Sequence, residues 1–199
     1  MFRGIRNRGY LSRWAERFGV FEAPQWESSI WLHAVSVGEF NAAIPLVDEL
    51  LRRHPSDPIV ITTITPTGSD RVRKIYGDRV FHVYLPYDLP AAIRRFFARV
   101  KPRIALIMET EIWPNLYFEC RDRAIPIVLA NARLSERSLR GYGPVQSLAT
   151  EAVRCIEMIA AQSRIDAERF LRLGAHSERM QVLGNVKFDM PVPRGLDTQ

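Results

Sequence analysis

The chain has 199 residues, 47% of them hydrophobic and 25% charged, and a mean hydropathy of −0.12. This composition excludes a chain too polar to fold, and the length leaves room for one large domain or one domain with a tail. Cys120 and Cys155 are too few for a disulfide framework or a structural zinc site, because neither lies in a CxxC pair. A reducing compartment is therefore expected.

The charge balance is basic, with 28 Lys and Arg against 22 Asp and Glu and a pI of about 9.7. Positive charge favours an anionic partner, and nucleic acid, acidic lipid and phosphorylated metabolites all qualify on charge alone. The sequence has no run of about 18 apolar residues and no apolar signal segment with a cleavage site. As given, the chain is expected neither to span a membrane nor to be secreted.

Residues 1–28 form a basic and aromatic segment ahead of the first expected strand. Arginine alternating with large aromatic rings suits an anionic membrane surface, where rings lie at headgroup depth and guanidinium groups meet phosphates. The same spacing also fits a helix whose aromatic side chains pack on the main domain. The residues concerned are Arg3, Arg6, Arg8, Tyr10, Arg13, Trp14, Arg17 and Phe18.

From residue 29 to residue 187, short β-branched runs alternate with helical stretches. Most runs are continuously apolar, as the strands of a parallel sheet covered on both faces must be. This alternation predicts an α/β domain, a Rossmann-like doubly wound parallel sheet with its reactive loops at the carboxyl ends of the strands. Strands are expected at 30–35, 59–64, 80–85, 104–108, 125–130, 158–161 and 180–183, and helices at 41–53, 90–100, 115–123 and 164–173.

The alternating pattern stops after Gly184. Residues 188–199 include Pro191, Pro193 and Gly195 and show no periodicity, which predicts an interdomain linker or a cut end. The expected division of the chain is therefore 1–28, 29–187 and 188–199.

The turn after the first strand, residues 36–39, contains Ser36 and Gly38 and ends on an acid. Gly38 lies where the backbone is expected to turn tightly, and a helix N-terminus favours the ionised form of Glu39. A carboxylate there can accept a proton from a hydroxyl, so Glu39 is a candidate general base. The alternative is that Glu39 only stabilises the first helical turn.

The turn after the second strand, residues 62–69, is rich in hydroxyls around one glycine, and a helix is expected to open at Asp70. Such hydroxyls and backbone amides can hold phosphate or carboxylate. The Walker lysine and a GxGxxG pattern are both missing, which disfavours a nucleoside triphosphate. The alternative is that Ser69 or Thr67 is simply the helix N-cap. The candidate ligand residues are Thr65, Thr67, Gly68 and Ser69.

Two acids, Glu109 and Glu111, follow the wholly apolar fourth strand. Residues two apart point to opposite sides if a strand continues, so only one of them need face a cleft. Paired acids can bind a divalent cation, but no third ligand is evident and no metal site is predicted. Pro114 fixes the following turn, and Asn115 is the expected helix N-cap.

Arginines mark the turn after the fifth strand and one expected helix. Arg133 and Arg137 suit a phosphate or a carboxylate through bidentate hydrogen bonds, although Arg133 fits equally well an ion pair with Glu109 or Glu111. The basic residues of the expected helix and just after it, within 94–103, form either a solvated helix face or an extension of a membrane-facing patch. They are Arg94, Arg95, Arg99, Lys101 and Arg103.

Five blocks of the sequence, taken together and in order, strongly resemble the N-terminal half of the Kdo transferases, the 3-deoxy-D-manno-octulosonic acid transferases of lipopolysaccharide synthesis. The likeness runs from about Gly9 to Asp189, and five ordered blocks make it specific. Residues 184–189 resemble that family's link to a second domain. The blocks are 33–39, 62–69, 84–88, 108–116 and 131–138.

The resemblance implies a GT-B glycosyltransferase with two Rossmann-like domains facing a cleft and no need for a metal or another cofactor. This chain would be the N-terminal half, which binds the acceptor, while the C-terminal half would hold the donor CMP-Kdo. The implied reaction moves Kdo to a lipid A precursor with inversion, at the cytoplasmic face of the bacterial inner membrane. The expected partners are the lipid A precursor, CMP-Kdo and an anionic membrane surface.

The likeness also implies roles for individual residues. Glu39 matches the family's catalytic glutamate, which would deprotonate the acceptor hydroxyl, and Glu109 or Glu111 would orient the acceptor or support that base. The turn from Thr65 to Ser69 would line the cleft, and Arg133 and Lys187 would reach anionic groups of the substrates. Since the sequence contains neither the family's hydrophobic anchor nor its donor domain, a fragment that is inactive alone is expected.

One alternative function from another class is a non-catalytic module at a membrane surface, which binds a phosphorylated lipid or a protein partner. A gene that extends past Gln199 would favour the enzyme, and a natural stop there would favour the module. Nucleic-acid binding is supported by the pI alone, because the sequence has no recognition motif and no stacking array of aromatics.

Overall fold

The computed structural model describes residues 12–186, so Lys187 and the basic residues ahead of Ser12 lie outside the described part. Its centre is a seven-stranded sheet in the order β3-β2-β1-β4-β5-β6-β7, and all neighbouring strands are parallel. The strands are β1 (Ser29–His33), β2 (Ile59–Thr63), β3 (Phe81–Tyr84), β4 (Pro102–Met108), β5 (Ile127–Ala132), β6 (Met158–Ala161) and β7 (Met180–Val182).

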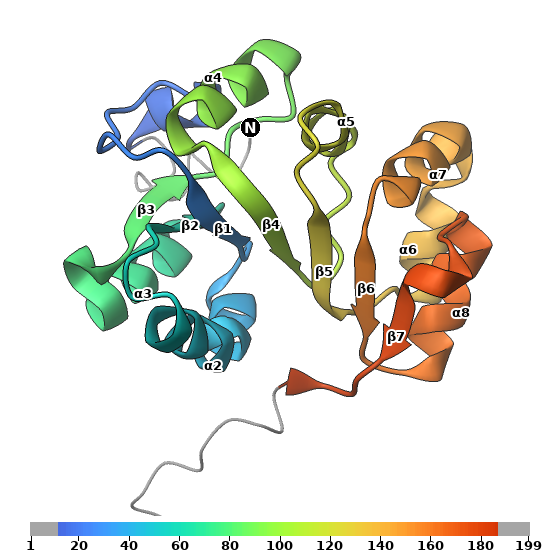
Figure 1. The fold of residues 1–199 in the computed structure, drawn as a ribbon. Coiled ribbons are helices and arrows are strands. Elements are labelled where there is room, and N and C mark those ends of the chain that lie inside the picture. Colours follow the sequence, from blue (N-terminus) through green and yellow to red (C-terminus); the bar gives the residue numbers. More distant parts are fainter. Residues whose placement is uncertain (1–11, 187–199) are drawn as a thin grey trace, which may run out of the picture.

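Helices cover both faces of this sheet (Figure 1). Helices α2 and α3 pack on one face, and α4, α5, α7 and α8 pack on the other. The α-helices are α2 (Val37–Arg53), α3 (Pro66–Tyr76), α4 (Pro90–Val100), α5 (Pro114–Asp122), α6 (Glu136–Gly141), α7 (Gln146–Arg154) and α8 (Arg164–Leu173). The 3-10 turns are η2 (Trp14–Phe18), η3 (Gly77–Arg79), η4 (Gly143–Val145) and η5 (Ser177–Arg179).

Burial on both faces explains the continuously apolar strands. Strands β1 and β2 are buried at every residue. Successive side chains of β1 enter opposite cores, since Ile30 and Leu32 pack with α2 and α3, whereas Trp31 packs with Phe96 and Phe97 of α4. The predicted α/β fold class, a Rossmann-like doubly wound parallel sheet, is confirmed.

The chain reverses its direction of winding between β1 and β4. From β1 it builds outward through β2 to β3, and it then returns through α4 to place β4 on the other side of β1. Loops at the carboxyl ends of two such strands diverge and leave a crevice, which is where open α/β sheets bind ligands. The topology therefore selects the carboxyl ends of β1 and β4 as the position of a site.

The segment before β1 packs on the domain through two arginines. Arg17 is only 4% exposed, donates from Nη2 to the carbonyl of Ile64 at 2.8 Å, and stacks over the ring of Tyr84 at 4.5 Å. Arg13 lies 4.6 Å from the same ring and donates to the carbonyl of His82 at 3.0 Å and to the hydroxyl of Ser69 at 2.9 Å. These two cations are engaged with the domain, as the packing interpretation of residues 1–28 requires.

Three cations of the basic run at 94–103 bind the same segment. Arg95 donates to the carbonyl of Phe18 at 2.8 Å, and Arg99 donates to the carbonyl of Phe21 at 2.8 Å. Lys101 donates to the carbonyl of Trp26 at 3.0 Å. These side chains hold residues 18–26 along α4, so they are neither simply solvated nor directed only at a membrane.

Most expected elements are present, but three helix starts differ from the sequence prediction, and the first is α2, which begins at Val37 and not at residue 41. All seven strands occur within a few residues of their expected ends, and helices 90–100 and 164–173 have the predicted bounds. The start of a helix at Asp70 is wrong, because Pro66 occupies the first turn of α3 and Thr65 caps it. Asn115 is not the N-cap of α5, which begins one residue earlier at Pro114. No helix within residues 12–186 is both long and apolar enough to cross a membrane.

We expect Arg17→Ala to lower the free energy of unfolding by about 2–4 kcal/mol, because it removes a charge-assisted hydrogen bond and a desolvated cation–π contact. Urea unfolding monitored by tryptophan fluorescence measures the change. Arg52→Ala is the control, since that arginine pairs with Glu49 on the surface and is 66% exposed. Equal unfolding midpoints for the two variants would show that the Arg17 contacts do not stabilise the domain.

Candidate active site at the carboxyl ends of β1 and β4

The turns after β1, β2, β4 and β5 lie at this edge of the sheet, and main-chain hydrogen bonds join them in two pairs. The N–H groups of Ile64 and Thr65 donate to the carbonyl of Val35 at 3.1 and 3.3 Å, which joins the β2–α3 turn to the β1–α2 turn. The N–H of Glu109 donates to the carbonyl of Ala130 at 2.9 Å, which joins the end of β4 to the end of β5. The sequence-predicted residues on these turns are thus brought to one edge.

Ser36 and Glu39 form a reciprocal cap at the start of α2. The Ser36 hydroxyl accepts from the N–H of Glu39 at 3.4 Å, and the Glu39 carboxylate accepts from the N–H of Val35 at 2.8 Å and from the Ser36 hydroxyl at 3.1 Å. This is a capping box shifted by one residue, and it holds the carboxylate back over the end of β1. Glu39 therefore does stabilise the helix start, and its half-buried side chain also lies at the carboxyl edge of the sheet.

Gly38 is not at a tight turn, contrary to the sequence prediction. It occupies the second position of α2 and is exposed, and a Cβ at this residue would meet only the Ser36 hydroxyl, at 3.8 Å. Neither a positive φ nor a close contact requires glycine here. Gly38 remains a predicted substrate contact because the surface in front of it is open.

The turn after β4 begins with a residue in the left-handed region. Glu109 has φ +58°, a conformation that costs a residue with a side chain about 1–2 kcal/mol. The kink ends the strand at Met108, so the alternation expected for a continuing strand does not apply to Glu109 and Glu111. Beyond this residue, Glu111 lies near enough to Glu39 for the charge of that carboxylate to act on it.

Glu111 has an unusual affinity for its proton. Its pKa is raised to about 7, first by burial, next by the charge of Glu39 and last by that of Glu109. The indole N–H of Trp113 acts in the opposite direction, although it makes no hydrogen bond of normal geometry. The main chain of Glu111 is fixed, because its carbonyl accepts from the Tyr117 hydroxyl. Two neighbouring carboxyl groups whose environments push one pKa upward are a common arrangement in acid–base sites.

The hydroxyl-rich turn after β2 caps α3, and fewer of its hydroxyl groups are exposed than the sequence predicts. Thr65 accepts from the N–H of Gly68 at 3.1 Å, so it is the N-cap in place of Thr67 or Ser69. Gly68 is buried against the side chains of Thr63 and Thr65, the latter 2.9 Å from where a Cβ would lie. Ser69 is 1% exposed and accepts from Arg13.

The predicted ligand residues of this turn fall into an accessible pair and a buried pair. Thr67 is exposed and Thr65 half-buried, so their hydroxyls lie within reach of a ligand. The buried Gly68 and Ser69 instead support the turn from behind. The predicted substrate contact of Ser69 is the one that the structure disfavours, because its hydroxyl is already bound to Arg13.

Arg133 is exposed beyond the end of β5. The ion pairs among the described residues include none between Arg133 and Glu109 or Glu111, so the structural pairing weighed from the sequence is not seen. A guanidinium group that projects from the carboxyl edge without an acidic partner is suited to an anionic ligand. Lys187 lies just outside the described residues.

Two residues that the sequence did not assign have clear structural roles. The Asp88 carboxylate accepts from the N–H groups of Asn115 and Leu116 at 3.0 and 2.9 Å, so a residue 27 positions earlier caps α5. His33 is fully buried at the end of β1, with Nδ1 2.8 Å from the Thr62 hydroxyl. Burial lowers the pKa of His33 to about 4, so this imidazole is neutral at physiological pH.

No group of three or more His, Cys, Asp or Glu residues within the described residues has the geometry to hold a metal ion. The expectation of a metal-independent reaction stays a prediction.

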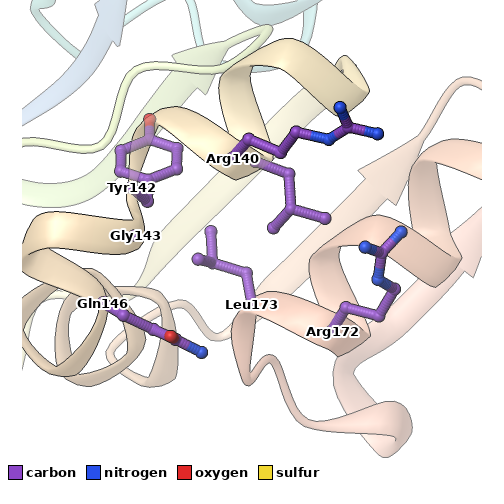
Figure 2. A pocket seen from close by; sticks show the side chains of 7 residues that line it. Arg140, Tyr142, Gly143, Gln146, Arg172 and Leu173 are labelled. Carbon is purple, nitrogen blue, oxygen red and sulfur yellow. The ribbon is translucent and has the colours of Figure 1, made fainter.

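A surface hollow lies elsewhere, between α6, α7 and α8 (Figure 2). Arg140 and Arg172 line it, and both donate to the carboxylate of Glu136. None of the predicted site residues lines this hollow, and its cations are already paired. The edge at β1 and β4 remains the candidate site.

Solved structures with the same fold define the class of this domain. The chain matches UDP-GlcNAc 2-epimerase from Neisseria meningitidis bound to UDP-GlcNAc with a TM-score of 0.57 and 15% identity, over 81% of this chain and 48% of that one. It matches a putative UDP-N-acetylglucosamine 2-epimerase from Listeria monocytogenes with a TM-score of 0.58 and 17% identity, over 81% and 46%. The domain is one Rossmann-like half of a GT-B fold, as predicted.

Sequence comparison identifies the family within that class. The family model described as 3-deoxy-D-manno-octulosonic-acid transferase (kdotransferase) matches residues 12–190, and the chain belongs to this family. It is 44% identical to the 3-deoxy-D-manno-octulosonic acid transferase of Haemophilus influenzae and 39% identical to that of Bordetella pertussis. These matches cover 94% and 82% of this chain but 44% and 39% of the relatives, so the chain spans less than half of their length. The resemblance seen in five sequence blocks is confirmed.

We expect the Glu111 carboxyl to titrate near pH 7 in a carbon-detected NMR titration, because burial and the charge of Glu39 favour its protonated form. Glu39→Gln removes that charge and should move the midpoint to lower pH. A Glu111 midpoint below pH 5 in the unsubstituted chain would contradict the geometry.

The same shift predicts a pH dependence of stability. The folded-state pKa of Glu111 lies above its ordinary value of 4.5, so the folded chain binds the proton more tightly than the unfolded chain. The stabilisation is complete below about pH 4.5 and is lost as the pH rises through 7. Glu111→Gln should flatten this part of the profile, measured by urea unfolding at a series of pH values.

Proposed function

We propose that this chain is the acceptor-binding half of an inverting glycosyltransferase that moves Kdo from CMP-Kdo to a lipid A precursor in lipopolysaccharide synthesis. The family match over residues 12–190 carries the proposal. The gathering of Glu39, Glu109 and Glu111 where β1 and β4 end supports it, because this edge would face a second domain across a cleft. On this view the chain alone transfers no sugar, since the donor would be bound by a C-terminal half.

Glu39 is the general base of the proposed reaction. Its carboxylate takes the proton of an acceptor hydroxyl while that oxygen attacks the anomeric carbon of Kdo. The bond from this carbon to the phosphate oxygen of CMP breaks, and the electron pair leaves with CMP. A single displacement of this kind inverts the anomeric centre, and it needs a base on the acceptor side only.

The surroundings of Glu39 favour that role. The Val35 N–H and the Ser36 hydroxyl hold the carboxylate in one orientation, so its position is fixed before substrate arrives. Glu111, with a pKa of about 7, is partly protonated at neutral pH and can donate a hydrogen bond to the acceptor or to Glu39. Thr65, Thr67 and Arg133 then supply acceptor contacts from the neighbouring turns.

An exposed aromatic cluster supports attachment to the cytoplasmic face of the bacterial inner membrane. The rings of Trp14, Phe18 and Tyr87 lie 5.5–6.0 Å from one another, and Trp14 and Tyr87 are 46% and 39% exposed. Leu89 beside Tyr87 is 50% exposed. Aromatic rings with arginines nearby partition into the interface of an anionic bilayer, where the proposed acceptor's headgroup lies.

The same cluster favours one alternative, a non-catalytic module that binds a membrane surface through a phosphorylated lipid. This alternative requires no second domain and no general base. Sugar transfer by the full-length protein excludes it, whereas vesicle binding without any transfer favours it.

In the full-length protein, we expect Glu39→Gln to lower turnover by about 10²–10⁴-fold, the usual contribution of general-base catalysis. Release of CMP with a lipid A precursor as acceptor measures the rate. Glu49→Gln is the matched control, because it lies on the same helix and pairs only with surface arginines. Turnover in Glu39→Gln equal to that of the control would remove Glu39 from the role of base.

Replacing both Trp14 and Tyr87 by alanine should weaken binding to phosphatidylglycerol vesicles by about tenfold or more, because two interfacial rings are lost. Binding of the unsubstituted chain should also fall as salt is raised from 50 to 500 mM. Cosedimentation measures both effects, with Trp26→Phe as the control because that ring packs against Phe81. Equal binding to neutral and anionic vesicles would contradict membrane attachment through this surface.

A further inference from the structure

The turn between β5 and α6 is held by two side chains of α8. Asp166 accepts from the N–H of Leu134 at 3.0 Å, and Arg169 donates from Nη1 to the carbonyl of Leu134 at 3.1 Å. Both main-chain polar groups of one residue are thus bound by two side chains one helical turn apart. Leu134 is fully buried, so its main chain has no access to water as an alternative partner.

Asp166 is itself built into the fold. It is 8% exposed, its N–H donates to the Ser163 hydroxyl at 3.1 Å as the cap of α8, and its second oxygen accepts from that hydroxyl. Arg169 Nη1 lies 3.9 Å from the carboxylate. A buried carboxylate with this many partners has one stable position, and the N–H that it accepts from is placed with it.

The sheet alone does not fix this turn. The pairing of β5 with β6 shifts register between Leu129 and Ala132, and Asn131 within this interval has φ +53°. An interrupted ladder leaves the end of a strand less constrained than regular pairing does. The position of the following residues therefore depends on contacts from outside the sheet. Gln162 donates to the carbonyls of Asn131 and Ala132, each at 2.9 Å, and the two contacts from α8 follow at Leu134.

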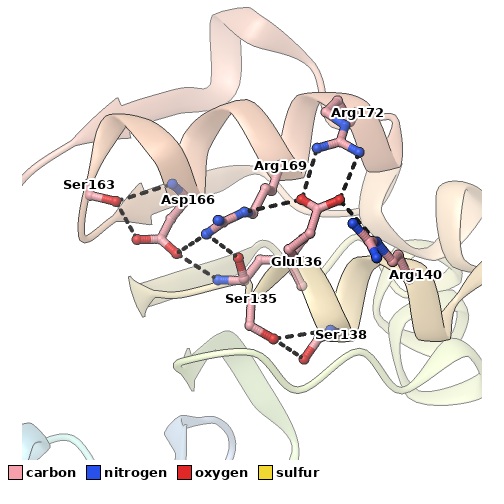
Figure 3. A network of polar contacts seen from close by, with 9 residues as sticks. Ser135, Glu136, Ser138, Arg140, Ser163, Asp166, Arg169 and Arg172 are labelled. Atoms are coloured by element: carbon pink, nitrogen blue, oxygen red, sulfur yellow. Dashed lines mark hydrogen bonds and ion pairs between the residues drawn. The ribbon is translucent and has the colours of Figure 1, made fainter.

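Three other arginines near the turn are tied to one acid. Arg140, Arg169 and Arg172 all contact the carboxylate of Glu136, at 3.4, 3.5 and 3.0 Å (Figure 3). Arg133, directly before Leu134, takes no part in this network and is exposed at the carboxyl edge of the sheet. Among the described residues, Arg133 and Arg137 have no acidic partner, and of these two Arg133 directly follows β5 at the carboxyl edge of the sheet.

We propose that Asp166 and Arg169 are positioning residues, which clamp Leu134 and thereby hold Arg133 toward an anionic group, phosphate or carboxylate, of the substrate at this edge. The proposal rests on the proposed function for the identity of that substrate. Neither residue touches the ligand itself. Their effect passes through the main chain of Leu134 to the neighbouring Arg133.

Amide hydrogen exchange tests the clamp without any activity. The Leu134 amide should exchange at least tenfold faster in Asp166→Ala and in Arg169→Ala than in the unsubstituted chain. Arg172→Ala is the matched control. Arg172 lies on the same helix as Arg169 and also binds the Glu136 carboxylate, but it makes no contact with Leu134. Equal Leu134 exchange in Arg169→Ala and Arg172→Ala overturns the proposal.

Kinetics of the full-length protein test the consequence. Arg133→Ala and Arg169→Ala should each raise the KM for a phosphorylated lipid A precursor by about tenfold, with less than a threefold change in kcat. The double variant should show no more than the effect of Arg133→Ala, because Arg169 acts through Arg133. Arg169→Lys, which keeps a donor for the Leu134 carbonyl, should recover part of the loss, and Arg172→Ala should stay within twofold of the unsubstituted protein.

The outcomes separate the two proposals. Additive effects in the double variant, or a fall in kcat with KM unchanged, overturn the positioning role while leaving Kdo transfer intact. Absence of transfer by the unsubstituted full-length protein overturns the proposed function and, with it, the substrate part of the inference. The exchange of the Leu134 amide then still decides whether the clamp exists.

Discussion

The parallel pairing of β1 with both β2 and β4 is the constraint on which the candidate site depends. It brings the turns after three strands to one edge, and main-chain bonds from Ile64 and Thr65 to Val35 extend the pairing into the turns themselves. Side chains far apart in sequence become neighbours there without any direct bond between them. The raised pKa of Glu111 is the electrostatic result, since it arises from burial and from charge carried by a different strand connection.

A single residue can serve fold and chemistry together at such an edge. Glu39 caps α2, and the hydrogen bonds that make it a cap also orient its carboxylate. Glu109 adopts a left-handed backbone conformation at the point where β4 ends, and Glu111, two residues later, lies within the influence of the Glu39 charge. From the sequence, a structural role and a functional role for these acids are alternatives. The arrangement of these residues in the fold allows both roles at once.

Local patterns predicted the strands, the layers and the edge, because continuous apolar runs and their alternation with helices depend on near neighbours only. Contacts between distant parts of the chain could not be predicted. The residues around Asp88 do not indicate that it caps α5, and the residues around Ser69 do not indicate that its hydroxyl binds Arg13. Thr65 could have been recognised as the cap of α3, since a threonine before proline is a common helix start. The register shift in β5 has no sequence signal at all.

Arg13 and Arg17 connect the beginning of the described chain to the turn after β2. Arg13 is bonded to Ser69 and to His82, and Arg17 to Ile64. These bonds anchor the residues after Ser12 at two places besides the 3-10 turn η2, namely the β2–α3 connection and strand β3. A pull on the chain at Ser12 would therefore act directly on the turn that contains Thr65 and Thr67.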